Sequence, residues 1–175
     1  MFENIIKNVH NRHPLIHCIT NYVSINDCAN IVLACGGAPI MAEDINEVSQ
    51  ITSICQGLDI NIGMLNDNKL SSMLKAGATA NELGIPVILD PVGAGSSDYR
   101  IKAVQNLMSN VQFGVIRGNV SEIKAIAAKQ GIHNIAAGVY DTMQKDKSAM
   151  GVEAGIADKI TDDNIKEMAD FINKL

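Results

Sequence analysis

The chain has 175 residues, of which 47% are hydrophobic and only 3% aromatic, so it can bury the core of one domain with aliphatic side chains. Its formal net charge is -5 and it has no basic run, which argues against nucleic-acid binding, because that needs Lys and Arg to neutralise phosphates. No stretch of 18 apolar residues and no signal-peptide pattern occurs, so we expect a cytoplasmic protein that does not enter a membrane.

Short apolar runs alternate with helix-like stretches along the chain. Residues 15–20 predict a strand, residues 25–35 a helix that ends at two glycines, and residues 38–41 and 58–62 two further strands. The second half predicts, in order, a helix (69–83), a strand (86–89), a helix (101–111), a strand (114–116) and a helix (121–129). Thr161 is a good N-cap for a final amphipathic helix, and residues 131–160 read as loop with at most one short helix. The alternation predicts one α/β domain over residues 1–175 with a mostly parallel sheet.

The four cysteines are Cys18, Cys28, Cys35 and Cys55. No two of them form a C-x-x-C pair, and the four histidines do not cluster with them, which argues against a zinc site. The chain is large enough to fold without disulfide bonds, so we expect reduced and mostly buried thiols.

Ligands of an open parallel sheet bind beyond the carboxyl ends of its strands, and residues 90–97 follow one such end. Asp90 could hold a divalent metal through water, while Gly93 and Gly95 would let backbone N–H groups approach an anion. The alternative is a plain strand-to-helix turn in which Asp90 has a capping role.

Residues 117–122 follow the next predicted strand. Asn119 and Glu122 are three apart, so an amide and a carboxylate would face the same edge, where they suit a magnesium–phosphate group, and Arg117 suits a nucleotide phosphate. The alternative is a capping box, with Asn119 as N-cap and Glu122 as the third helical residue.

Polar and apolar candidates also lie near the first two strands. Asn21, after the first strand, could hydrogen-bond a small polar ligand. His17 lies inside that strand, which favours a core histidine with its hydrogen bonds satisfied over a base or a metal ligand. Met41 by itself reads as a core residue, because methionine commonly fills gaps in cores.

At these same positions the sequence resembles the hydroxyethylthiazole kinase family. Five stretches carry the resemblance, in the family's order and roughly its spacing: PLIHCITNYV (14–23), GGAPIMA (36–42), NIGML (61–65), LDPVGAG (89–95) and IRGNVSEI (116–123). The resemblance is strong from residue 10 to about 127 and looser over 150–175.

The resemblance implies a three-layer ribokinase-like α/β fold and ATP-dependent phosphorylation of 4-methyl-5-(2-hydroxyethyl)thiazole in thiamine biosynthesis or salvage, with Mg²⁺. By motif position, Asn21 and Met41 would line the thiazole pocket. Arg117 and Asn119 would contact ATP, and Asp90 and Glu122 would hold the metal. Members of the family are usually trimers, so a homo-oligomer is expected.

The sequence departs from the family pattern in one respect. The family carries, further along the chain, a Gly-Thr-Gly-Cys segment whose helix N-terminus forms an anion hole for the transferred phosphate. No such segment occurs in this sequence, so no catalytic residue is assigned and the domain is expected to be incomplete at its C-terminus. The alternative function is a catalytically inactive remnant that at most binds the thiazole or assembles with other subunits.

Overall fold

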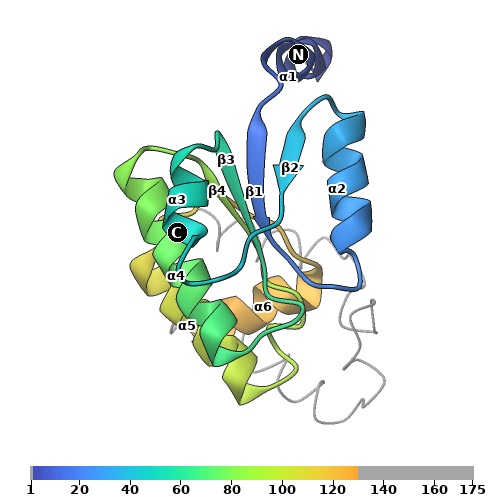
Figure 1. Ribbon diagram of the computed structural model, residues 1–175. Coiled ribbons are helices and arrows are strands. Elements are labelled where there is room, and N and C mark those ends of the chain that lie inside the picture. Colours follow the sequence, from blue (N-terminus) through green and yellow to red (C-terminus); the bar gives the residue numbers. More distant parts are fainter. Residues whose placement is uncertain (1, 130–175) are drawn as a thin grey trace. The chain divides into compact units, whose positions relative to one another are not determined.

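The structure, a computed structural model, describes residues 2–129 (Figure 1). Its elements in chain order are α1 (Phe2–Arg12), β1 (Leu15–Ile19), α2 (Ile25–Ala34), β2 (Ala38–Ile40), α3 (Val48–Ser53), β3 (Gly57–Asn61), α4 (Asp67–Glu82), β4 (Val87–Asp90), α5 (Asp98–Asn110), β5 (Val115–Ile116) and α6 (Val120–Lys129). No helix among these residues is long and apolar enough to cross a membrane.

The contacts divide the chain into two compact units, which are described separately. The first unit comprises Met1–Asp90 and Leu107–Ile116, and it contains the whole sheet. The second comprises Pro91–Asn106 and Arg117–Leu175, and it contains the loop after β4, most of α5, and α6. The expectation of a single domain over residues 1–175 stays a prediction.

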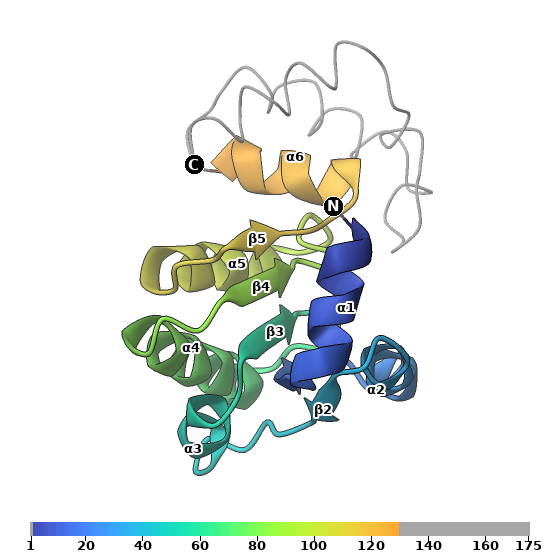
Figure 2. The same cartoon turned by 90° about the horizontal axis from the view of Figure 1, so that it is seen from above.

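The five strands form one parallel sheet in the order β2-β1-β3-β4-β5. From β1 the chain first moves outward to β2, and it then returns past β1 to β3 and continues in the opposite direction. The strand order therefore reverses between β1 and β3. Since crossovers between parallel strands are right-handed, the helices before and after such a reversal must cover opposite faces. Figures 1 and 2 show this: α2 lies on one face of the sheet, and α3 and α4 lie on the other.

The core sits against the central strands. Leu58, Ile60 and Leu89 are fully buried, as expected for a parallel sheet with helices on both faces. Helix α4 covers these strands because its residues at helical spacing are small or apolar, among them Met73, Ala76 and Gly77. The expected α/β fold with a parallel central sheet is confirmed.

The edge strand β2 is short and carries a proline in its middle. The N–H of Ala38 donates to the carbonyl of Pro14 on the β1 side, at 2.9 Å. Because successive residues of a strand point their N–H groups in opposite directions, the nitrogen of Pro39 faces away from β1. The missing N–H of Pro39 therefore costs the sheet no hydrogen bond.

Some sequence expectations need correction. The thiols are all free, but only Cys18 and Cys55 are buried, whereas Cys28 is half-buried and Cys35 is exposed. Burial, followed by the nearby charge of Asp59, raises the pKa of Cys18 to about 12, so this thiol does not ionise at neutral pH. The helices α1 and α3 were not predicted, and the expected helix after Thr161 lies outside the described residues.

Candidate functional site

The carboxyl ends of β1, β3 and β4 are joined by a line of three side chains within the first unit. Asn61, the last residue of β3, donates from Nδ2 to Oδ2 of Asp90 at 3.0 Å. Its Oδ1 accepts from Nδ2 of Asn21 at 3.2 Å. Asn61 is only 7% exposed, so these bonds are shielded from water. The line crosses the reversal of strand order between β1 and β3, which is where open α/β sheets bind their ligands.

The loop that follows β3 is fixed against this line. The N–H of Gly63 donates to Oδ1 of Asn61 at 2.8 Å. A Cβ atom at Gly63 would lie 2.9 Å from that oxygen and 3.0 Å from Nδ2 of Asn21, too close for any side chain. Asn21 also accepts through Oδ1 from the N–H and the hydroxyl of Ser24, at 3.0 and 3.1 Å. Asn21 is therefore held in one orientation by neighbours on both sides.

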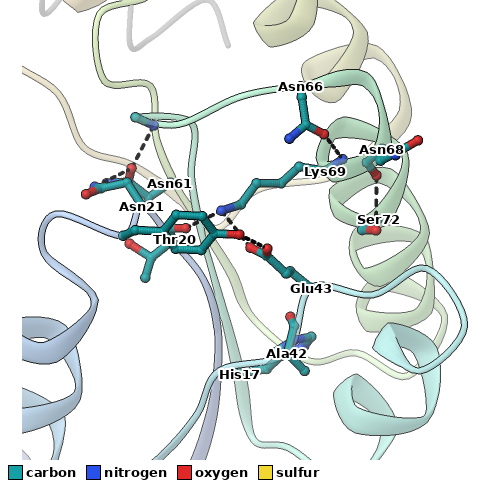
Figure 3. A network of polar contacts seen from close by, with 12 residues as sticks. His17, Thr20, Asn21, Ala42, Glu43, Asn61, Asn66, Asn68, Lys69 and Ser72 are labelled. Carbon is teal, nitrogen blue, oxygen red and sulfur yellow. Dashed lines mark hydrogen bonds and ion pairs between the residues drawn. The ribbon is translucent and has the colours of Figure 1, made fainter.

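A buried lysine lies beside the same loop (Figure 3). Nζ of Lys69, in the first turn of α4, donates to the carbonyl of Thr20 and forms an ion pair with Oε2 of Glu43 at 2.7 Å. The same ammonium lies 4.7 Å from the ring centroid of Tyr22, whose hydroxyl donates to Oε1 of Glu43. Partial burial would raise the pKa of Glu43, but the bonds from Lys69 and Tyr22 outweigh it, and the net pKa is lowered. The bond to Glu43 raises the pKa of the Tyr22 hydroxyl.

Met41 is half-buried in the segment after β2, and the residue next to it is anchored to the core. Nε2 of His17 bonds to the carbonyl of Ala42 at 2.8 Å, and Nδ1 bonds to the hydroxyl of Thr52 at 2.9 Å. His17 is 0% exposed, which confirms the prediction of a core histidine with satisfied hydrogen bonds. The role of His17 is thus to hold the Met41 segment against β1.

The buried His17 predicts a stability that falls in acid. Burial lowers the pKa of His17 below its ordinary value of 6.5, and the Ala42 bond and the charge of Glu47 only partly oppose this. Below pH 6.5 the unfolded chain takes up a proton that folded His17 refuses, so acid favours unfolding by up to about 1.4 kcal/mol per pH unit, until His17 itself titrates. We expect urea unfolding to show that the free energy of unfolding falls less between pH 7.5 and pH 5.5 for His17→Gln than for the unsubstituted chain. An equal acid loss in both proteins would contradict this.

In the second unit, Asn119 and Glu122 form a reciprocal capping box at the start of α6. The N–H of Glu122 donates to Oδ1 of Asn119, and the N–H of Asn119 donates to Oε2 of Glu122, both at 2.8 Å. The capping alternative is therefore confirmed. The capping box is compatible with a role of Glu122 at a magnesium–phosphate group. Its second carboxylate oxygen, Oε1, makes a further bond outside the box.

That further bond joins α6 to the glycine-rich loop after β4. The N–H of Gly93 donates to Oε1 of Glu122 at 2.8 Å, and Gly93 has a φ of 66°, a conformation that favours glycine. Arg100 donates from its guanidinium to the carbonyl of Val92 at 2.9 Å, on the other side of the same turn. Glu122 is only 6% exposed. Its carboxylate accepts hydrogen bonds from two backbone N–H groups, those of Gly93 and Asn119. Arg117, by contrast, is exposed just after β5.

The comparisons with known proteins identify the family of this chain. The model of the "Hydroxyethylthiazole kinase family" matches residues 6–162. The chain belongs to the hydroxyethylthiazole kinase family. A relative named hydroxyethylthiazole kinase from Clostridium acetobutylicum is 52% identical over 171 residues, which are 98% of this chain and 57% of the relative. One of the same name from Alkaliphilus metalliredigens is 59% identical over 124 residues, or 71% of this chain and 46% of the relative.

A solved hydroxyethylthiazole kinase structure, from Pyrococcus horikoshii OT3, shares the fold. It is 38% identical with a TM-score of 0.71, and the match covers 78% of this chain and 53% of that one. The chain therefore spans about half the length of the hydroxyethylthiazole kinases that it matches.

The sequence alone assigned no role to two residues of the candidate site. Asn61 was quoted within a matching stretch but given no role, although it joins Asn21 to Asp90. Lys69 is the first residue of the helix that the sequence predicts over residues 69–83. The only signal for it was weak: a positive charge in the first turn of a helix is disfavoured by the helix dipole.

Proposed function

We propose that this chain contributes the thiazole pocket and part of the nucleotide site to an ATP-dependent kinase that phosphorylates the hydroxyl of 4-methyl-5-(2-hydroxyethyl)thiazole in thiamine biosynthesis or salvage. The observation that carries the proposal is the Asn21–Asn61–Asp90 line, centred on buried Asn61, at the reversal of strand order in a chain that belongs to this family. The names of the relatives favour the kinase over a non-catalytic remnant.

In this proposal Asn21 and Met41 line the thiazole pocket, because they follow the neighbouring strands β1 and β2 at the carboxyl edge of the sheet. Asn21 offers an amide to a polar group, and Met41 offers an adaptable apolar surface. A pocket that combines one oriented amide with apolar contacts suits a small heteroaromatic alcohol. Arg117 and Asn119 contact ATP, and the exposed guanidinium of Arg117 suits a phosphate.

Asp90 and Glu122 are proposed to hold Mg²⁺. The described residues contain no cluster of three or more acidic, cysteine or histidine side chains, but magnesium in phosphoryl-transfer sites is held by one or two carboxylates, waters and the substrate phosphates. Each oxygen of Glu122 accepts one backbone N–H and retains a second lone pair. The carboxylate of Glu122 therefore keeps the capacity to bind the ion, which would supply charge neutralisation at the transferred phosphate. We also propose that the protein acts in the cytoplasm as a homo-oligomer, a trimer as is usual in the family.

Binding and turnover test the proposal separately. We expect the 175-residue chain to bind 4-methyl-5-(2-hydroxyethyl)thiazole in a calorimetric titration and to bind 5-ethyl-4-methylthiazole, which lacks the hydroxyl, at least about tenfold more weakly. Met41→Ala should weaken the binding of both thiazoles, because it removes apolar contact that both of them make. Release of ADP that requires the thiazole alcohol would support the kinase.

Two different results would contradict different parts of the proposed function. Binding without turnover would contradict phosphoryl transfer by this chain and support the remnant. No saturable binding by a folded, monodisperse chain would contradict the thiazole assignment itself.

A further inference from the structure

The burial of the Lys69 ammonium costs desolvation energy, and the stability of helix α4 does not explain it. The side chain of Lys69 is only 4% exposed, although it lies in the first turn of α4, where the helix dipole disfavours a positive charge. The desolvation of a buried ammonium is large enough that an apolar side chain of similar volume is often as stable. The burial of Lys69 is therefore better explained by what its ammonium holds.

The ammonium holds two different loops. One is the loop after β1, through the carbonyl of Thr20 and the ring of Tyr22. The other is the segment after β2, through the carboxylate of Glu43. Tyr22 donates its hydroxyl to the same carboxylate, so the two loops are also bonded to each other. We call these four residues, Lys69, Thr20, Tyr22 and Glu43, the lysine tie.

The lysine tie lies next to both residues that we assign to the thiazole pocket. Asn21 stands between Thr20 and Tyr22, and Glu43 follows Met41 by two residues. We propose that Lys69 is a positioning residue, which fixes the Asn21 loop and the Met41 segment relative to each other and thereby sets the affinity for the thiazole alcohol. The identity of that ligand rests on the proposed function. Figure 3 shows the side chain of Lys69 extending from α4 toward Thr20 and Glu43.

Loss of the lysine tie should affect the binding of the thiazole alcohol and of the nucleotide differently. Every residue of the lysine tie belongs to the first unit, as does Asp90, whereas Arg117, Asn119 and Glu122, which are most of the residues that we assign to the nucleotide and metal, belong to the second. Loss of the tie should therefore weaken the binding of the thiazole alcohol much more than that of Mg-ATP. If the lysine tie had a purely structural role, its loss would weaken the binding of both ligands equally.

The test is Lys69→Met, which keeps the length of the side chain and removes its charge. Its matched control is Lys75→Met on the same helix, because Nζ of the exposed Lys75 also donates to a loop carbonyl, that of Ile45, at 2.8 Å. Without ligand, we expect Lys69→Met to speed amide hydrogen exchange in residues 20–24 and 41–45, and Lys75→Met to leave residues 20–24 unchanged. In calorimetry, Lys69→Met should raise the Kd of the thiazole alcohol about tenfold or more, since bonds to charged groups are strong, with the Kd of Mg-ATP within about twofold.

A second variant decides the matter if Lys69→Met does not fold. The side chain of Glu43 is 41% exposed, so Glu43→Gln should fold, and it should show the same exchange pattern with a smaller rise, about threefold, in the thiazole Kd. Unchanged exchange at residues 20–24 and 41–45 in the folded variants would overturn the inference, as would an equal loss of both ligands. If the unsubstituted chain bound no thiazole alcohol, the proposed function would fail, and the exchange experiment would still judge the lysine tie.

Discussion

Glu122→Ala is expected to destabilise the start of α6 and to abolish measurable binding of Mg-ATP. The carboxylate of Glu122 accepts one backbone N–H from Gly93 and one from Asn119, and alanine leaves both donors without it. A lost cap costs about 1 kcal/mol and a buried donor without an acceptor about 1–3 kcal/mol, so the free energy of unfolding should fall by about 2–4 kcal/mol. Urea denaturation followed by circular dichroism measures this change.

Glu122→Gln separates the capping role from the metal role. Glutamine can also serve as the third residue of a capping box, but it has one acceptor oxygen where glutamate has two, so the N–H of Gly93 loses its acceptor. The stability should therefore fall by about 1–3 kcal/mol, less than in Glu122→Ala. Its neutral amide is a poor ligand for magnesium, so the affinity for Mg-ATP should still fall, by about tenfold or more. Full Mg-ATP affinity in a stable Glu122→Gln protein would show that Glu122 is only a cap.

Asn61→Asp is expected to have the second large effect, through like charges at the centre of the proposed pocket. The substitution keeps the acceptor for Gly63 and Asn21 but replaces the donor to Asp90 with a second carboxylate, at a position where donor and acceptor are 3.0 Å apart. Two carboxylates this close cannot both ionise easily, so the pair holds a proton with a raised pKa. We expect a loss of about 2–4 kcal/mol of stability at pH 7 and no detectable thiazole binding.

The pH dependence of Asn61→Asp has a definite sign. A carboxyl whose pKa is raised on folding binds its proton more tightly in the folded state, so stability is retained in acid and lost as the pH rises. Urea unfolding should therefore show the variant recovering part of its deficit between pH 7 and pH 5.

The chain supplies a matched control in Asn46→Asp. Nδ2 of Asn46 donates to Oδ1 of Asp44 at 2.9 Å, and this pair is exposed. The same exchange of amide for carboxylate should cost less than about 1 kcal/mol there, because water screens the repulsion. Equal effects at Asn61 and Asn46 would contradict the importance that we give to burial.

The sequence was sufficient to predict the parallel sheet and the capping box, because both are encoded in short local patterns. Alternating apolar runs placed the strands, and the spacing of Asn119 and Glu122 placed the start of α6. Helix α3 has only six residues, of which Val48 and Thr52 are buried, too few to produce a helical period. Helix α1 does carry a helical period, with apolar residues Phe2, Ile5, Ile6 and Val9 at i, i+3, i+4 and i+7, so its sequence contained a signal for it.

The candidate site was only partly predictable, since its bonds join residues far apart in the chain. Asn21 and Asp90 could be proposed from their places at strand ends, but the bridge between them depends on β3 lying between β1 and β4. The partners of Lys69 are Thr20 and Glu43, and no local pattern indicates that these three meet. The family resemblance assigned roles to single residues, whereas the structure shows which of them are bonded to one another.

Strand β2 also limits how the sheet can grow. An unprotected outer strand invites another chain to extend its ladder, and this is a common route to aggregation. Here the outer strand has three residues, and its middle residue, Pro39, has no N–H to offer on the outward side. An incoming strand would find no donor at the centre of this edge, so β2 acts as a gatekeeper against edge-to-edge polymerisation. Copies of the chain that associate at this end of the sheet therefore receive no backbone donor from Pro39.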